Sequence, residues 1–448
     1  MGPRDLDAEL RQWAILAVGA LALGGLMALS LALLRTPGVQ DLLPVGYFRM
    51  ALVVHVVFTV VLWYLAMLGL MSTWAASGLA EDGLRVRLGG AGALAVRAVA
   101  LSFPVMAVPV LAGWGEPILN NYVPVATHPA FFAGLALFLV AVAVPVARLL
   151  ASMPKAMESA AFGIAAAGMI YLVALACFLL AWQGLPPGLD PHPYHEALFW
   201  GGGHVLQFAN AALMLVVWQA VAERLHGVPP LPPAWFRGVL AAIATVALGG
   251  PLLYLVLEPA DARLVTGFTD LYRYGLIVQP TVMMAALAWA LIRRGTHLGR
   301  PAGAGLVLSL ALFAVGGVLG YFMGEGDTRT TGHYHAVIGG VTLAFMVFLI
   351  EVVLPRLGRP LAGRRWPLAF IWSYGLGQLL HAVGLWLAGT GGVARKTAGA
   401  AQGLEGPLEV GAMIVMGGGA VLAVFGGVTF VVLALGKLLM REGTSTAS

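Results

Sequence analysis

The sequence predicts an all-α polytopic membrane protein with twelve transmembrane helices. The mean hydropathy of the 448 residues is +0.90, and 60% of them are hydrophobic while only 10% are charged. Twelve apolar runs are each long enough to cross a hydrocarbon layer of about 30 Å. Loops rich in Lys and Arg on the inner side explain the net charge of +5, so no nucleic-acid partner is expected.

The twelve expected spans follow one another without a long linker or a low-complexity tract. They cover residues 13–34, 48–74, 92–113, 129–150, 160–182, 196–222, 236–257, 272–292, 302–323, 333–354, 367–389 and 411–438. Because only short segments separate them, residues 1–448 are expected to form a single transmembrane domain. The one cysteine, Cys177, excludes an internal disulfide, a four-cysteine metal site and covalent heme attachment through CxxCH.

The distribution of positive charge predicts the orientation of the chain. With the N-terminus inside, eighteen of the 25 Lys and Arg residues fall on the inner side, among them Arg4, Arg11 and Arg441. The other seven fall outside. Since cytoplasmic loops carry the excess of Lys and Arg, both termini are expected to be cytoplasmic.

The motif His333-Tyr334-His335 opens the tenth apolar run. Each residue of a helix turns by about 100°, so these two imidazoles point about 200° apart. They cannot bind one metal together, but they can hold two cofactors, one on each side of the helix. Because an imidazole is costly in lipid, the motif indicates a helix that lies between two hemes.

Two more histidines are expected at the same depth. His55 lies in the second run and His204 in the sixth, and both runs start on the outer side, as the tenth does. The alternative is four separate core histidines, each bonded to a neighbouring carbonyl. His381, in the eleventh run, either packs beside a cofactor or is a hydrogen-bonded core residue.

The glycines before His204 and the remaining histidines are weaker indicators of a cofactor site. Gly201-Gly202-Gly203 precedes His204 and removes side chains where a flat macrocycle or a metal would approach, although glycine also serves plain helix packing. His128 lies in a polar stretch, where we favour a loop role over contact with a cofactor edge. His192 and His195 fall in or beside outer loops, whereas His226 and His297 fall in cytoplasmic loops.

With these residues in place, the chain resembles the catalytic subunit (subunit I) of the heme-copper oxidase superfamily, which includes the nitric oxide reductases. The resemblance rests on the twelve spans and on Gly332-His333-Tyr334-His335 followed by Ala336-Val337-Ile338-Gly339-Gly340. It implies two b-type hemes. His333 would bind the high-spin heme, His335 and His55 the low-spin heme, and His204 a non-heme metal.

Departures from the oxidase pattern suggest which metal this is. The oxidases carry a His-His pair after the seventh span, but no histidine lies between His226 and His297 here. One subgroup of the oxidases carries a redox-active tyrosine four residues after the sixth-span histidine, where this chain has Phe208. Another subgroup places that tyrosine on the seventh span, where Tyr254 lies, but we do not assign the role to Tyr254.

Carboxylates occupy the region where the histidine pair is missing. Glu258 and Asp261 are three residues apart, so they project from the same face of a helical turn, which Pro259 distorts. One imidazole with carboxylates suits ferrous iron better than copper. We therefore expect iron bound by His204, Glu258 and Asp261, with Gln207, Glu196 and Asp270 in reserve. The alternative is a solvated loop in which the carboxylates pair with Arg263.

The resemblance then implies a nitric oxide reductase, which reduces two NO to N2O and water, closest to divergent members with carboxylate ligands. Arg329, beside Glu325 and Asp327, either contacts heme propionates or pairs with Asp327. An outer-face donor subunit with heme c or a binuclear copper centre is expected, in the inner (cytoplasmic) membrane of a bacterium or archaeon. The alternatives are a terminal oxidase reducing O2 at a heme-copper centre, a heme-only electron-transfer protein, and a transporter.

Overall fold

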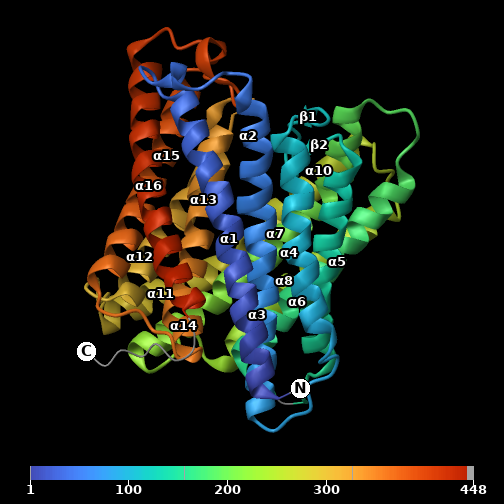
Figure 1. Cartoon of the computed structure of the whole chain (residues 1–448), viewed down its shortest axis with the longest axis vertical. Helices are drawn as coiled ribbons and strands as arrows, with labels where there is room; N and C mark the ends of the chain where they lie inside the picture. The colour runs from blue at the N-terminus through green and yellow to red at the C-terminus, as the bar shows by residue number, and fades with distance from the viewer. Residues whose placement is uncertain (1, 156, 325, 441–448) are drawn as a thin grey trace. The chain divides into compact units, whose positions relative to one another are not determined.

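The computed structural model describes residues 2–155, 157–324 and 326–440, so Glu325 and Arg441 lie outside the described residues. The protein is built almost entirely from helices (Figure 1). The α-helices are α1 (Pro3–Arg35), α2 (Tyr47–Val56), α3 (Trp63–Glu81), α4 (Ala91–Leu111), α5 (Pro129–Ala151), α6 (Ser159–Gly184), α7 (Pro191–His226), α8 (Pro233–Ala247), α9 (Gly249–Tyr254), α10 (Ala262–Gly275), α11 (Val278–Arg294), α12 (Pro301–Leu319), α13 (Thr328–Phe348), α14 (Leu354–Arg356), α15 (Arg365–Thr390) and α16 (Pro407–Leu439).

Shorter elements join or interrupt these helices. A π-helical segment, Val57–Leu62, connects α2 to α3, and a second, Leu349–Val353, connects α13 to α14. Three 3₁₀ turns cover Gln40–Leu42, Gly320–Phe322 and Gly399–Gln402. The strands β1 (Pro117–Ile118) and β2 (Val125–Ala126) pair antiparallel in one loop.

The prediction of twelve transmembrane helices is confirmed for the part of the chain that the structure describes. Twelve helical stretches there are long and apolar enough to cross a membrane, and each coincides with one expected span. The largest boundary difference is in the eighth, which runs over Ala262–Arg294 rather than 272–292. Its first part, α10, is more polar than a membrane helix, which is why the hydropathy pattern missed it.

Helix boundaries follow local chemistry that is visible in the sequence. Proline occupies the first turn of α5, α7, α12 and α16, where its missing N–H costs nothing. Asp261 and Asp327 cap α10 and α13, each accepting from the backbone N–H two residues on. Gly227 ends α7 at φ 77°, in the left-handed region that glycine adopts most easily.

The helices group into two compact units. Unit 1 comprises Met1–Leu10 and Arg49–Gly295, and unit 2 comprises Arg11–Phe48 and Thr296–Ser448. Both consist of helices of membrane-spanning length, and the single transmembrane domain remains a prediction. His55 and His204 belong to unit 1, whereas His333, His335 and His381 belong to unit 2.

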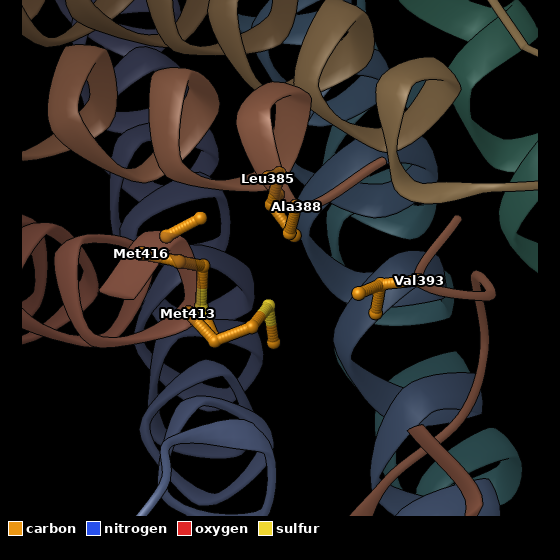
Figure 2. Packing of buried hydrophobic residues seen from close by; sticks show 6 residues of the cluster. Leu385, Ala388, Val393, Met413 and Met416 are labelled. Carbon is orange, nitrogen blue, oxygen red and sulfur yellow. The ribbon is translucent and has the colours of Figure 1, made fainter. Parts of the chain in front are cut away.

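Unit 2 is held together by close backbone contact between α15 and α16, which run side by side (Figure 1). A Cβ atom at Gly377, Gly384, Gly419 or Gly426 would clash with backbone atoms of the facing helix. Small residues of this kind let membrane helices pack closely without a hydrophobic driving force. Next to this contact, Leu385 and Ala388 of α15 and Val393 of the following loop pack with Met413 and Met416 of α16 (Figure 2).

Unit 1 contains a buried ion pair between the first and fourth spans. Arg148 on α5 donates to both carboxylate oxygens of Glu9 on α1, at 2.5 and 2.7 Å, and to Thr73 on α3 at 3.0 Å. The exposed fractions of the Arg148 and Glu9 side chains are 0% and 3%. A Cβ atom at Gly92 would clash with both side chains, so α4 also packs against the pair.

Removing one partner of this pair should cost more stability than removing both. Arg148→Met leaves the Glu9 carboxylate buried without its cation and is expected to destabilise the fold by about 3–5 kcal/mol. Arg148→Met combined with Glu9→Gln should recover much of the loss. Thermal unfolding in detergent measures both, with the exposed Arg85→Met as control. Additive losses in the double variant would contradict a coupled pair.

Candidate functional site

His333 is a residue of α13, and its side chain contacts α12. Its Nδ1 is 2.7 Å from the carbonyl oxygen of Gly316 on α12. The ring also lies against Gly320, where a Cβ atom would come within 2.8 Å of the His333 Cε1. Gly316 also lets α12 approach α13 closely, because a Cβ atom at Gly316 would lie 2.6 Å from the backbone nitrogen of Val337. The imidazole is thus held in one position by two glycines.

This hydrogen bond also fixes the tautomer of His333. A carbonyl oxygen only accepts, so Nδ1 carries the proton and Nε2 of the neutral ring carries the lone pair. Histidines that bind metals commonly donate the other ring N–H to a backbone carbonyl in this way. The His333 side chain therefore has the chemistry that an axial ligand of a heme iron requires.

His335 occupies the opposite face of α13. Its ring lies against His381 of α15, with 4.4 Å between the ring centroids. The expectation that the two imidazoles of the motif point to different sides is confirmed, since one packs toward α12 and the other toward α15. Their roles as ligands of two different hemes remain predictions.

His55 is half-buried at the end of α2. The π-helical segment Val57–Leu62 begins two residues later, and Thr59 donates a hydrogen bond of 2.6 Å to the His55 carbonyl. The tenth span contains the second π-helical segment, Leu349–Val353. Such segments occur frequently at functional sites, and here both lie in spans that carry candidate heme ligands.

His204 is buried in unit 1 among aromatic rings. Its ring centroid lies 4.7 Å from Tyr122, 4.8 Å from Trp200, 5.9 Å from Tyr272 and 6.1 Å from Phe268. Its Nδ1 is 2.9 Å from the Trp200 carbonyl, so Nε2 carries the lone pair, as in His333. The sequence does not indicate this aromatic cage, because its members come from three separate segments: the loop before α5, α7 and α10.

The three glycines before His204 accommodate aromatic side chains. A Cβ atom at Gly201 would clash with Tyr254 and Phe268, one at Gly202 with Phe178, and one at Gly203 with Tyr122. The macrocycle or metal that we expected beside these glycines is therefore not needed to explain them. Because these three glycines have no side chain, four aromatic rings can pack against one turn of α7.

The expected carboxylates do not gather around His204. Among the residues that the structure describes, no three His, Cys, Asp or Glu side chains lie close enough to hold a metal ion. Glu258 is exposed. Asp261 caps α10 and forms an ion pair of 2.6 Å with Arg263, which is the alternative role considered for it. The hydrogen bond from Arg263 lowers the pKa of the Asp261 carboxyl below its ordinary value.

The reserve ligands do not replace these carboxylates. Glu196 accepts hydrogen bonds from the backbone and side-chain nitrogens of Asn121, at 2.9 and 2.6 Å. Asp270 is exposed, and Gln207 is half-buried. The donor set of this structure therefore does not fit a three-ligand iron site at His204.

Arg329 forms an ion pair with a carboxylate of this chain, and its guanidinium is not directed to an anionic cofactor. Its guanidinium lies 2.8 Å from Asp327, which again is the alternative considered for it. Arg395, for which the sequence gives no signal, donates to the hydroxyl of Tyr334 at 3.0 Å. The loop after α15 brings it there, because Thr328 donates to the Val393 carbonyl and Arg395 to the Gly326 carbonyl.

Three of the remaining histidines make hydrogen bonds that stabilise local structure. His128 caps α5 by accepting from the Ala130 N–H, which agrees with the loop role favoured for it. His195 is buried, places Nδ1 2.6 Å from the Pro191 carbonyl and stacks on Phe132. His226 lies 3.0 Å from the Gly295 carbonyl, while His192 and His297 are exposed.

Comparison with known proteins identifies the fold. No family model matches the chain. A solved cryo-EM structure of a heme-copper terminal oxidase dimer matches it with a TM-score of 0.77 at 14% identity, covering 99% of this chain and 85% of that one. The chain has the heme-copper oxidase fold. It is a multi-pass α-helical protein, and twelve helical stretches of its described residues are long and apolar enough to cross a membrane.

Two curated relatives match much of the sequence. An uncharacterized protein of Aquifex aeolicus (strain VF5) is 29% identical over 352 residues, which cover 77% of this chain and 84% of that protein. An uncharacterized protein of Rickettsia prowazekii (strain Madrid E) is 22% identical over 499 residues, covering 96% of each. Both relatives are uncharacterized, so the fold rests on the solved structure and the reaction has to be argued from the site.

The Asp327–Arg329 pair at the start of α13 predicts a pH-dependent stability. The hydrogen bond from Arg329 holds the pKa of Asp327 below its ordinary value. The pair's contribution is therefore complete above the unfolded pKa of about 3.9, and is lost as the pH falls through the lower folded pKa.

Asp327→Asn keeps the helix cap but removes the charge. Asp327→Ala also removes the cap, which should lower the free energy of unfolding by about 1 kcal/mol more. We expect the difference in melting temperature between wild type and Asp327→Asn to be present at pH 7 and to decline from about pH 4 downward, as the pH falls through the lower folded pKa of Asp327. Thermal unfolding in detergent at a series of pH values measures it. A difference that stays constant with pH would show that the charge is not responsible.

Proposed function

We propose that this protein is a heme-binding membrane oxidoreductase that reduces nitric oxide. The observation that carries the proposal is the placement of His333 and His335 on opposite faces of α13 within the heme-copper oxidase fold. One helix can then present an axial ligand to each of two b-type hemes. His55, on the second span, is the candidate for the other axial position at the heme of His335.

The chain's own residues would prepare these positions before a heme binds. Gly316 and Gly320 hold the His333 ring, and the Gly316 carbonyl keeps the proton on Nδ1 so that Nε2 is the coordinating nitrogen. A bound heme would supply an iron that exchanges single electrons. Arg395, bonded to Tyr334 between the two histidines, places a cation at the outer end of the motif.

Nitric oxide is favoured over dioxygen as the substrate because the residues of a three-histidine copper site are missing. No histidine lies between His226 and His297, and the neighbours of His204 are aromatic. Reduction of NO balances as two NO, two electrons and two protons giving one N2O and one water. This is two electrons fewer than the four that dioxygen reduction to water requires.

The second candidate is a heme-only electron-transfer protein of the membrane. It is favoured by one specific observation, the ion pair that engages Asp261 with Arg263 instead of a metal at His204. In this case His204 is a core histidine whose polar nitrogen is bonded to the Trp200 carbonyl. The two candidates share the hemes and differ in whether NO is reduced.

Electrons for either function would have to come from a partner. The one cysteine, Cys177, is buried, so this chain offers no pair of thiolates for a copper centre of its own. We propose a donor subunit on the outer face with heme c or a binuclear copper centre. The setting we propose is the inner membrane of a bacterium or archaeon, with both termini cytoplasmic.

Metal content and turnover of the purified protein separate these functions. The nitric oxide reductase is expected to hold two hemes per chain and to form N2O from NO with a chemical electron donor, and a further iron in it would need ligands other than Glu258 and Asp261. Two hemes without a third metal and without turnover would support electron transfer instead. One copper per chain with oxygen uptake would identify a terminal oxidase and overturn the proposal.

Substitution of the histidines tests which heme each one holds. His333→Ala should remove the high-spin heme and abolish turnover, whereas His335→Ala and His55→Ala should each remove the low-spin absorption. His128→Ala, which only loses a helix cap, serves as the control and should keep both hemes. Optical and magnetic circular dichroism spectra measure the result. Survival of both hemes in all three variants would refute the assignment.

A further inference from the structure

His381 is placed to act on His335. The two rings lie at 72° to each other with 4.4 Å between their centroids, so the edge of one ring lies against the other ring. Nδ1 of His381 is 3.0 Å from the Met416 carbonyl oxygen. Because a carbonyl only accepts, that nitrogen carries the proton, and Nε2 of the neutral His381 presents a lone pair.

The position of His381 is set by backbone contacts rather than by its own side chain. A Cβ atom at Gly419 would clash with the backbone nitrogen of His381, and one at Gly384 would clash with the backbone nitrogen of Met416. The α15 and α16 backbones therefore touch on both sides of the His381–Met416 hydrogen bond. On the other side, a Cβ at Gly332 would lie 2.7 Å from the Ala382 carbonyl, which brings α13 equally close.

We propose that His381 is a positioning residue for the low-spin heme: its Nε2 accepts the Nδ1–H of His335, so that His335 coordinates through Nε2. This inference rests on the proposed function, since it requires a heme at His335. It completes a relay that runs from the Met416 carbonyl through His381 to His335. The relay fixes the tautomer of both rings from the backbone of α16.

The relay has an electronic consequence for the heme iron. A histidine ligand that donates its other N–H to a strong acceptor becomes a more basic ligand. A more basic ligand favours the ferric over the ferrous state, so His381 should lower the midpoint potential of the low-spin heme. For a one-electron couple, each tenfold change in that preference corresponds to about 59 mV.

The test is a redox titration of the low-spin heme in variants of the whole protein. His381→Phe keeps a ring but has no acceptor, and a tenfold loss of ferric preference would raise the potential by about 59 mV. His381→Gln retains an acceptor oxygen and should stay close to wild type. His195→Phe also loses a bond between an imidazole and a carbonyl but lies on α7, so its potential should not change.

Other outcomes would overturn this role for His381. An unchanged potential in His381→Phe with a normal low-spin spectrum would show that His381 does not act on the iron. Loss of the low-spin heme in both His381 variants, with its retention in His55→Ala, would make His381 an axial ligand. Absence of a low-spin heme from the wild-type protein is a separate result, because it refutes the proposed function itself.

Discussion

A polar group within an apolar helix bundle must find its partner inside the protein, because lipid offers none. Many of the described hydroxyl groups bond to a carbonyl of their own helix, while other side chains reach the backbone of a neighbouring helix. His333 reaches Gly316, His381 reaches Met416, and Ser309 reaches the carbonyl of Gly340 at 2.7 Å. Each of these three bonds joins two helices, and the first two also orient an imidazole ring.

Glycine makes these bonds possible by letting the helices approach. The carbonyl that accepts from His333 belongs to a glycine, and the one that accepts from His381 lies opposite Gly384. The same residue type around His204 admits aromatic rings instead of a second helix. The chemistry of each histidine thus depends on where its neighbours lack a side chain.

The sequence was sufficient for the spans and for the faces of α13, because hydropathy and helical periodicity are local properties. It failed where the outcome depends on contacts between distant segments. Asp261 and Glu258 have a spacing suitable for metal ligands, but Arg263 lies close enough to form an ion pair with Asp261 instead. The cage around His204 and the partnership of His335 with His381 join residues from different helices, and no spacing in the sequence indicates either.

The ion pair of Glu9 with Arg148 has a consequence for biogenesis. The two residues are 139 positions apart, so the ribosome completes the first helix well before the fourth exists. Burying a carboxylate without its cation is costly, and Glu9 gains Arg148 only when the fourth helix has been made. The final packing of the first helix therefore depends on a residue translated three helices afterwards.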